Sequence, residues 1–354
     1  MNGRSFRRIS GAWRALWPCC LLLLAACGGA TPTVPGVAPG ASTPTPPTNV
    51  TTRGTPPAPV AAPFAGIRTV FVIVMENHNW ADIAGSPAAP YINGTLLPLA
   101  SRAERYANPP GVHPSLPNYL WLEAGQDFGI RDDNDPARNH QGTRAHLTAQ
   151  LDAAGIPWKA YQEGIDGTSC PLRARGRYAP KHNPMVYFDD VTAANDAHSA
   201  SCIAHERPYD ELAGDLAAGT VPRYAFITPD LCHDMHDTCG LLSNPITQGD
   251  SWLTGAVPAI LNSAAYRDGG VLFITWDEGE GGGDGPIGLL ALSPRARGHG
   301  YRNTIPYTHS SLLATLQRIF GVGPPLGDAA TATDLRDLFG APIGTLPSTA
   351  IPTR

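Results

Sequence analysis

Thr69-Val70-Phe71-Val72-Ile73-Val74-Met75 is a continuous run of apolar, mostly β-branched residues, and it leads directly into Glu76-Asn77-His78-Asn79. An apolar run of this length, without polar alternation, predicts a strand that is buried on both faces, as in the interior of a parallel sheet. The polar residues that follow it then lie where the strand ends. This stretch therefore predicts both the fold class and the place to look for a functional site.

Similar segments recur along the chain. Further strands are predicted at 224–228, 271–276 and 287–292, and a weaker one at 157–162. Helices are predicted between them at 145–154, 209–218, 255–266 and 310–320, with Pro258 either in the first turn of its helix or as a kink. Strands that alternate with helices predict an α/β fold in which a mostly parallel central sheet lies between helix layers.

The composition divides the chain into four parts. Residues 1–26 have a basic start and a short apolar run, as a bacterial lipoprotein signal peptide has. Residues 27–63 are rich in Pro, Thr, Ala and Gly and predict a disordered linker. Residues 64–341 have the composition of a single globular domain, and 342–354 form a C-terminal tail.

The end of the signal peptide predicts a lipid anchor. Residues 24–27 read Leu-Ala-Ala-Cys, which resembles a bacterial lipobox, so Cys27 is expected to carry lipid at the start of the mature chain. The alternative is an ordinary cleaved signal next to an unrelated cysteine. The expected location is that of an exported bacterial lipoprotein on the outer membrane, facing the periplasm or the cell surface.

The charge of the chain argues against a nucleic acid as its partner. The formal net charge is −5, and removal of residues 1–26, which hold four Arg and no acidic residue, changes it to −9. No basic patch stands out in the sequence, as nucleic-acid binding would require.

Four cysteines remain after Cys19 and Cys20 leave with the signal and Cys27 is lipidated. An even number in an exported chain predicts disulfides, and proximity in the sequence pairs Cys170 with Cys202 and Cys232 with Cys239. A zinc site is the alternative, although neither a Cys-x-x-Cys pair nor suitable His spacing supports it.

Polar residues follow three of the predicted strands, those at 69–75, 224–228 and 271–276. Asp277 and Glu278 come directly after the strand at 271–276, and Glu76 and Asn77 follow the first strand. Because ligands bind at the carboxyl ends of parallel strands, these four side chains are expected to meet. Their oxygen atoms suit a divalent cation such as Ca²⁺, Mg²⁺ or Mn²⁺. For each pair alone, solvated loop acids or a helix N-cap explain the residues as well as a metal site does.

Ser115 begins the segment Ser-Leu-Pro-Asn, in front of a predicted helix. A helix N-cap is one interpretation of this serine. The other is a nucleophile, because a serine beside a metal ion and a helix N-terminus can ionise and attack phosphorus. In that interpretation Asn118 donates a hydrogen bond to a phosphoryl oxygen.

Two histidine-containing segments supply further candidates. The loop 230–237 holds Asp230, His233 and His236, which suit a second metal, phosphate-oxygen donors or a general acid. Solvated surface charges are the alternative. His309 starts the last predicted helix and reads equally well as a helix cap, where Thr308 is the other choice, or as a catalytic residue.

Four motifs in this order resemble the bacterial phosphoesterase family of phospholipases C and acid phosphatases, within the alkaline phosphatase superfamily. They are Glu76-Asn77 after the first strand, Ser115-x-Pro-Asn118, Asp277-Glu278-Gly279, and the helix that starts at His309 and ends near Gly321. The matching segments span roughly residues 70–321.

The resemblance implies an alkaline-phosphatase-like fold and a covalent phosphoserine intermediate at Ser115. It implies a divalent metal ion (Ca²⁺, Mg²⁺, Mn²⁺ or Zn²⁺) held by Glu76, Asn77, Ser115, Asp277 and Glu278. It also implies that nearby histidines stabilise charge or protonate the leaving oxygen, and the candidates are His233, His236 and His309, with Asp230 as a further ligand or orienting partner and His113 as an additional candidate.

The chain lacks two features that phospholipases C of this family often carry. Residues 285–291 hold neither an Asp-His pair nor an Arg-Val-Pro run. The expected function is therefore that of an acid phosphatase acting on phosphate monoesters. The alternatives are a phospholipase C acting on phospholipid headgroups and a non-catalytic metal- or anion-binding lipoprotein of the same fold.

Overall fold

The computed structural model describes residues 63–241 and 243–340. The predicted signal peptide 1–26, the lipidated Cys27, the C-terminal tail 342–354 and the linker, except for its last residue, lie outside the described residues. Among the described helices, none combines the length and the apolar character that crossing a bilayer needs.

The central sheet contains eight of the described strands, in the order β5-β4-β6-β1-β7-β8-β2-β9. A separate two-stranded sheet pairs β10 with β3. The strands are β1 (Thr69–Met75), β2 (Ser101–Ala103), β3 (Tyr106–Ala107), β4 (Trp158–Gln162), β5 (Glu206–Pro208), β6 (Tyr224–Thr228), β7 (Gly270–Trp276), β8 (Leu289–Leu292), β9 (Arg302–Asn303) and β10 (Tyr307–Thr308).

The sheet is mostly parallel, as the sequence predicts. β1 pairs in parallel with β6 on one side and with β7 on the other, and all residues of β1 and β7 are buried. β8 differs, because it pairs antiparallel with both β7 and β2. The run of apolar residues predicted a buried strand here but held no information about its direction.

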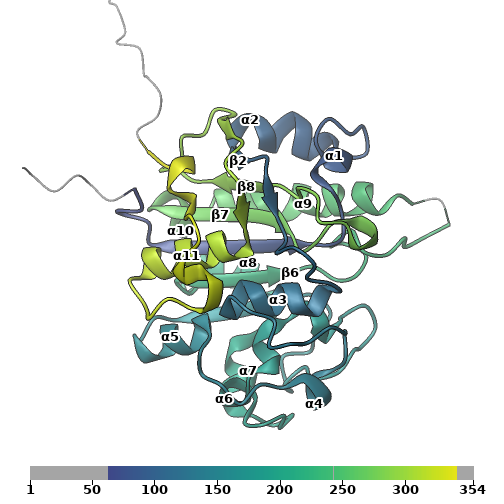
Figure 1. The fold of residues 1–354 in the computed structure, drawn as a ribbon, viewed down its shortest axis with the longest axis vertical. Coiled ribbons are helices and arrows are strands. Elements are labelled where there is room, and N and C mark those ends of the chain that lie inside the picture. Colours follow the sequence, from purple (N-terminus) through teal and green to yellow (C-terminus); the bar gives the residue numbers. More distant parts are fainter. Residues whose placement is uncertain (1–62, 242, 341–354) are drawn as a thin grey trace, which may run out of the picture. The chain divides into compact units, whose positions relative to one another are not determined.

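Helices cover both faces of this sheet. The α-helices are α1 (Trp80–Ile83), α2 (Leu97–Leu99), α3 (Ser115–Ala124), α4 (Pro136–Asn139), α5 (Leu147–Ala153), α6 (Asp189–Thr192), α7 (Ala200–His205), α8 (Glu211–Ala218), α9 (Pro245–Leu261), α10 (Ala264–Arg267) and α11 (His309–Phe320). Shorter turns are η1 (Ile92–Leu96), η2 (Pro180–His182), η3 (Pro184–Tyr187), η4 (Glu280–Gly282), η5 (Gly327–Ala330) and η6 (Leu335–Leu338). α3, α5 and α11 pack together on one face, and α9 packs against α8 and α10 on the other (Figure 1).

Three of the four predicted helices lie where the sequence places them, as α5, α8 and α11. The prediction of one helix over 255–266 is wrong, because α9 starts ten residues earlier, at Pro245, and ends at Leu261. Asn244 caps it by accepting a hydrogen bond from Thr247 N, and Pro245 occupies the first turn. Pro258 lies inside this helix rather than in its first turn.

Both predicted disulfides are present. Cys170 pairs with Cys202 and Cys232 pairs with Cys239, with Cα–Cα distances of 5.4 and 5.7 Å. The first bond ties the long connection after β4 to α7. The second closes a short loop after β6, at the carboxyl edge of the sheet.

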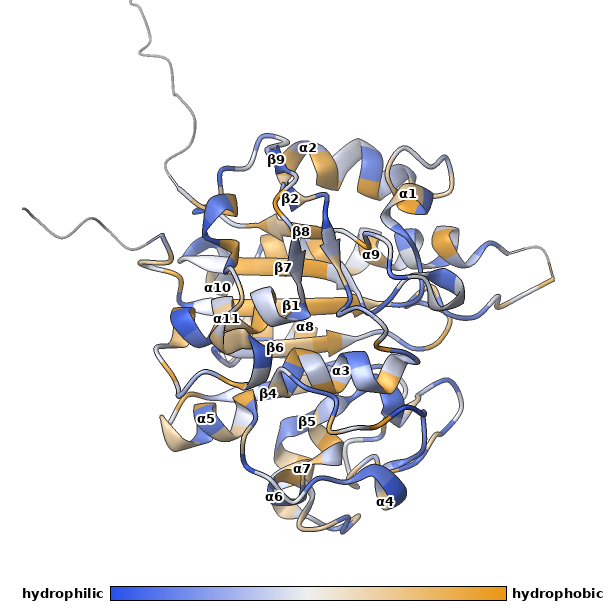
Figure 2. Cartoon of the chain, viewed as in Figure 1, coloured by the Kyte–Doolittle hydropathy of each residue, from blue (hydrophilic) through white to orange (hydrophobic). Residues whose placement is uncertain are grey.

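The segment that follows β1 is held against the sheet by a tryptophan. Trp80 packs edge-on against Trp276 with 6.2 Å between ring centroids, and it occupies the space where a side chain at Gly288 would lie. The central strands are hydrophobic, whereas polar residues follow β1 and β7 at their carboxyl ends (Figure 2). The fold thereby places these polar residues at one edge of the sheet.

Candidate active site

The residues after β1 and β7 lie side by side, because the two strands are paired up to Met75 and Trp276. Asn77 has a φ of +46°, a left-handed conformation that asparagine tolerates better than most residues. In this conformation its backbone N–H donates to Asp277 Oδ1 at 3.1 Å. The backbone thus joins the two predicted metal-binding pairs.

Ser115 approaches these carboxylates from α3. Its hydroxyl is buried and donates to Glu76 Oε2 at 3.0 Å. The interpretation of Ser115 as the N-cap is wrong, because Pro114 occupies that position and Ser115 is the first helical residue. Its side chain is therefore not used to cap the helix and points to the carboxylates instead.

Asn118 lies one turn further along α3 and faces the loop before the helix. Its amide nitrogen donates to the carbonyl oxygens of Val112 and Pro114, at 2.8 and 3.2 Å, and lies 3.4 Å from Glu278 Oε2. These contacts differ from the predicted hydrogen bond to a phosphoryl oxygen. In the structure Asn118 fixes the loop that delivers Ser115.

Glu278 is bound by His113, the additional candidate from the sequence. Nδ1 of His113 contacts Glu278 Oε2, and its Nε2 lies 3.0 Å from Asp284 Oδ1. Asp284 belongs to the glycine-rich loop after β7 and accepts a further hydrogen bond from Gly111 N. This loop therefore closes over the segment that precedes Ser115.

Burial raises the pKa of all three carboxyl groups, and repulsion adds to this at Glu76 and Glu278. Burial, followed by the charges of Asp277 and Asp234, raises the pKa of Glu76 well above its usual value. Burial raises the pKa of Asp277 to about 6. Burial and the charge of Asp277 raise the pKa of Glu278 to about 7. Three crowded carboxylates of this kind need a counter-charge to be ionised together.

The donor set fits a divalent cation. Glu76 Oε1 and Asp277 Oδ2 are buried and accept no hydrogen bond from a described residue. One atom of the Asn77 amide lies 3.1 Å from Glu76 Oε2 and 3.3 Å from Asp277 Oδ1. As nitrogen, this atom donates to both carboxylates, and as oxygen, it joins them in a set of hard ligands around a cation.

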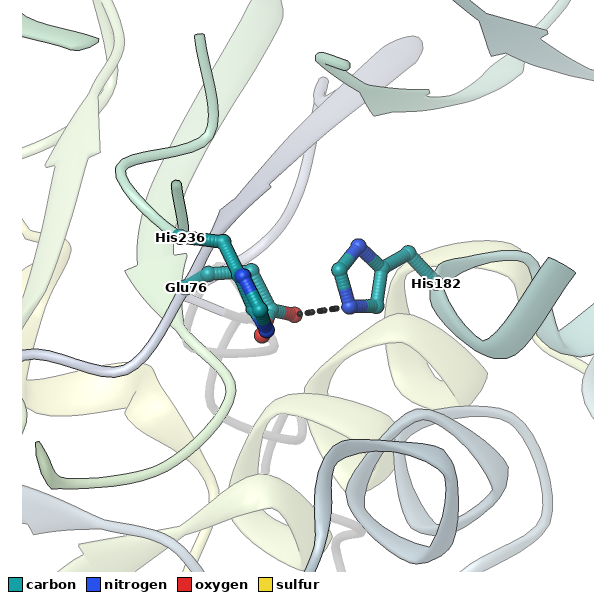
Figure 3. Close-up of side chains that lie close together, drawn as sticks. All are labelled: Glu76, His182 and His236. Atoms are coloured by element: carbon teal, nitrogen blue, oxygen red, sulfur yellow. Dashed lines mark ion pairs between the residues drawn. The ribbon is translucent and has the colours of Figure 1, made fainter. Parts of the chain in front are cut away.

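Sequence reasoning missed His182, which faces the same carboxylates. Its Nε2 lies 3.2 Å from Glu76 Oε1 and its Nδ1 lies 3.2 Å from Asp234 Oδ2 (Figure 3). Neither Nε2 nor Glu76 Oε1 makes a hydrogen bond, so the 3.2 Å contact between them is close but poorly aligned. Burial, together with the charges of Lys181 and His236, lowers the pKa of His182 well below its usual value.

His182 escaped prediction because it does not follow a strand. It lies in η2, twenty residues after β4, within the loop that the Cys170–Cys202 disulfide closes. The available signal was a Lys-His pair between Pro180 and Pro184, inside an otherwise apolar segment.

His236 belongs to the same cluster. Ligand atoms of Glu76, His182 and His236 lie within 4.8 Å of one another, and Figure 3 shows the three side chains converging. His236 Nε2 is 3.3 Å from the ammonium group of Lys181, which also donates to Asp133 Oδ2 at 3.1 Å. Lys181 therefore supplies the positive charge of this cluster.

His233 and Asp230 belong to a second cluster. His233 Nδ1 lies 2.9 Å from both carboxylate oxygens of Glu163 and 3.4 Å from Asp230 Oδ1. Asp230 Oδ1 also accepts hydrogen bonds from the backbone N–H groups of Cys232 and His233. The structure thus brings together His233 and Asp230, but with Glu163 rather than with Ser115.

His309 lies behind the candidate metal ligands. It is fully buried, with Nε2 at 2.6 Å from the carbonyl oxygen of Asp277 and Nδ1 at 3.0 Å from the hydroxyl of Tyr106. Burial lowers its pKa to about 4. Both ring nitrogens are in use, which suits a role in positioning Asp277. Thr308, the other candidate, caps α11 together with Ser311.

Known proteins are similar to this chain in sequence. A model of the Phosphoesterase family matches residues 106–323. The phosphatidylinositol-3-phosphatase of Mycobacterium tuberculosis is 30% identical over 271 residues, which cover 77% of this chain and 82% of that protein. An acid phosphatase of Aspergillus fumigatus is 28% identical over 273 residues, which cover 73% of this chain and 55% of that protein, so the chain spans about half of this fungal relative.

Solved structures of low identity share the fold alone. A protein of the alkaline phosphatase superfamily from Vibrio parahaemolyticus has a TM-score of 0.50 at 11% identity, covering 76% of this chain and 72% of that one. A putative sulfatase from Bacteroides thetaiotaomicron has a TM-score of 0.50 at 10% identity, covering 79% and 76%. The chain therefore belongs to the Phosphoesterase family, has the fold of the alkaline phosphatase superfamily, and is a phosphoric ester hydrolase.

Proposed function

We propose that the protein is a metal-dependent phosphomonoesterase of the acid phosphatase type that forms a phosphoserine intermediate at Ser115. The observation that carries this proposal is the hydrogen bond of 3.0 Å from the Ser115 hydroxyl to Glu76, at the start of α3. The hydroxyl thus lies beside buried carboxylates, Glu76, Asp234 and Asp277, whose negative charge exceeds the single positive charge of Lys181. The names of the relatives, a phosphatidylinositol-3-phosphatase and acid phosphatases, favour monoesters over the headgroup cleavage of a phospholipase C.

Glu76, Asn77, Asp277 and Glu278 would hold the metal ion, with the Ser115 oxygen as a further ligand. Bound there, a divalent ion would lower the pKa of the serine hydroxyl and stabilise negative charge on the phosphoryl group. Glu76 Oε2 is placed to accept the proton that Ser115 loses when its oxygen attacks phosphorus. Lys181 supplies a fixed positive charge for the phosphoryl oxygens.

The histidines divide into two roles in this proposal. His236 lies beside Lys181 and is the candidate that donates a proton to the leaving oxygen. His182 is neutral at physiological pH because its pKa is lowered, so it adds no positive charge between Glu76 and Asp234. His309 and Asn118 position Asp277 and the loop before Ser115.

The test is hydrolysis of p-nitrophenyl phosphate by the wild type and by Ser115→Ala, each with chelator and after metal is restored. We expect Ser115→Ala to lose at least about 10³-fold in kcat while its far-UV circular dichroism is unchanged. Ser251→Ala is the matched control, because Ser251 is exposed on α9. Wild-type turnover in Ser115→Ala would refute the nucleophile. Tight metal binding without turnover in the wild type would favour the non-catalytic alternative.

We also propose that the enzyme is an exported lipoprotein anchored through Cys27. Two disulfides within the catalytic domain support export, because such bonds persist in oxidising compartments. Mass spectrometry of the mature N-terminus, compared between the wild type and Cys27→Ala, tests this proposal. An unmodified N-terminus in the wild type would overturn it.

A further inference from the structure

A cavity of about 700 Å³ is lined by residues in and near α4 and by the connection after β4. This volume is within the range of pockets that bind small molecules. Its walls come from two segments, 134–138 and 164–178, together with Asn195 and Ala197. The mechanism proposed above uses none of these residues.

The cavity walls are direct continuations of segments that hold the catalytic cluster. Asn134 lines the cavity, and its neighbour Asp133 accepts hydrogen bonds from Leu116 N on α3 and from Lys181, at 3.0 and 3.1 Å. Tyr178 lines the cavity three residues before Lys181. Through Asp133 the cavity wall is joined to Lys181 and to the N-terminus of α3, where Ser115 lies.

The cavity has an apolar interior. Its exposed lining surface is mostly apolar, and the side chains of Ile165, Pro171, Leu172 and Tyr178 contribute to it. The Tyr178 hydroxyl donates to the carbonyl oxygen of Pro171 at 2.8 Å, and Cys170 forms a disulfide with Cys202. These two interactions fix the position of this wall. An apolar group of the substrate is expected to bind here through burial of its surface.

Arginines surround this apolar interior. Arg138, Arg173 and Arg175 line the cavity and are exposed, and the acidic residues Asp135 and Asp166 line it as well. Arg175 pairs with Asp166, whereas Arg138 and Arg173 make no ion pair with any residue of the part of the chain that the structure describes. Two unpaired arginines at one cavity stand out in a chain with a net charge of −5, and the guanidinium group matches phosphate well.

We propose that this cavity binds the leaving group of the substrate, and that this group combines an apolar body with a second phosphate. The inference rests on the phosphomonoesterase function proposed above and deepens it. Arg138 and Arg173 bind the second phosphate, and the apolar body covers Leu172 and Tyr178. Two sources have this chemistry, a phosphorylated phosphoinositide lipid and a soluble aromatic bisphosphate.

Steady-state kinetics with three substrates tests the proposal and separates the sources. Dibutanoyl phosphatidylinositol 3-phosphate represents the lipid, adenosine 3′,5′-bisphosphate the soluble compound, and p-nitrophenyl phosphate lacks a second anion. The measured quantity is kcat/KM for a substrate with a second phosphate, divided by kcat/KM for p-nitrophenyl phosphate. In the double variant Arg138→Ala/Arg173→Ala we expect this ratio to fall about tenfold or more, because the KM of the substrate with the second phosphate rises. Arg267→Ala is the matched control, because Arg267 is exposed and lies before β7, at the opposite end of that strand from Asp277.

The outcomes identify the source of the leaving group or overturn the proposal. A loss confined to the phosphoinositide identifies a lipid leaving group, and a loss confined to the nucleotide identifies a soluble one. The proposal would be overturned if, for both substrates, kcat/KM relative to that of p-nitrophenyl phosphate is the same in the double variant as in the wild type. Leu172→Ser tests the apolar wall separately, and it should raise the KM of the same substrate several-fold.

A binding measurement keeps this test independent of turnover. Calorimetric titration of Ser115→Ala with the same two compounds should show binding that weakens about tenfold when Arg138→Ala/Arg173→Ala is added. If the wild type hydrolyses no monoester but this binding is found, the proposed function fails and the ligand site stands. If hydrolysis is found and the arginines change neither KM nor binding, the ligand site fails alone.

Discussion

The protein contains two buried histidines that each lie between two carboxylates, and their surroundings differ. His146 directly precedes α5, with Nε2 at 2.9 Å from Asp190 Oδ1 and Nδ1 at 3.2 Å from Glu123 Oε1. Glu123 also accepts from the backbone N–H and the hydroxyl of Thr148, at 2.6 and 2.7 Å. Burial lowers the pKa of His146, but its hydrogen bonds to Asp190 and Glu123 outweigh this and raise it to about 9.

His182 lies between Glu76 and Asp234, but several polar atoms around it have no hydrogen-bond partner within the described residues. His182 Nε2, Glu76 Oε1, Asp234 Oδ2 and Asp277 Oδ2 are buried without a hydrogen-bond partner among the described residues. Burial and the neighbouring Lys181 and His236 hold the pKa of His182 low, so this histidine does not neutralise the carboxylates.

The contrast shows how a structural ion cluster differs from a candidate active site. In the His146 cluster the protein itself supplies both charges and the hydrogen bonds, so the cluster stabilises the fold. Around His182 the charge of Lys181 offsets only part of the negative charge of Glu76, Asp234 and Asp277, which is unfavourable for folding and suits the binding of a cation. Four expected results would sharpen or break this comparison.

The largest effect is expected from Glu76→Gln. Removal of this carboxylate charge should lower kcat for p-nitrophenyl phosphate by about 10³-fold or more, because both the metal ligand and the acceptor for the Ser115 proton are lost. In the presence of chelator the same variant should be as stable as the wild type or more stable, by on the order of 1 kcal/mol, because repulsion with Asp277 and Asp234 is relieved. Chemical denaturation measures this second effect, and a clear loss of stability would contradict the assignment.

Glu123→Ala should show the reverse pattern. It leaves His146 with one carboxylate and removes the acceptor for Thr148, so we expect a loss of about 3–5 kcal/mol in the free energy of unfolding. Turnover per folded molecule should change little. Active-site titration combined with urea denaturation separates the two quantities, and a variant of normal stability that is inactive would refute the structural role of this cluster.

His146 should make the free energy of unfolding depend on pH. Because its pKa in the folded protein is about 9, above its unfolded value of about 6.5, its stabilising contribution is complete below pH 6.5 and is lost as the pH rises through 9. The full contribution is on the order of 3 kcal/mol. Thermal unfolding of His146→Gln between pH 6.5 and 9.5 should lack this part of the wild-type slope. Identical slopes in the two proteins would show that His146 is not charged in the folded state.

The smallest expected effect concerns the metal. A divalent ion at 100 times its Kd should stabilise the wild type by about 2.7 kcal/mol, because it binds the folded state. Asp277→Asn, with one ligand charge removed, should gain much less from the same ion. Melting curves with Mg²⁺, Ca²⁺, Mn²⁺ and Zn²⁺ measure the shift and rank the four ions. An equal gain in Asp277→Asn would place the ion elsewhere.

Much of the candidate active site could be predicted because its residues follow strands. Glu76, Asn77, Asp277 and Glu278 come directly after apolar runs, and the parallel pairing of β1 with β7 then places them together. Proximity in the sequence was also sufficient for both disulfides.

Other residues could not be predicted from strand ends. Lys181 and His182 reach the site from a short turn, and Asp133 reaches it from a loop, so only tertiary packing places them. The start of α9 was missed for a different reason. Its first turns contain Gly249, where Met235 packs so closely that a side chain would not fit, and this glycine weakened the helical pattern.

The Cys232–Cys239 bond has a consequence for where the enzyme can work. It closes the eight-residue loop that carries both Asp234 and His236, so the geometry of two site residues depends on a covalent link that a reducing cytoplasm does not maintain. On the proposed export, this bond would form only in the oxidising compartment, and the arrangement of Asp234 and His236 would be completed there.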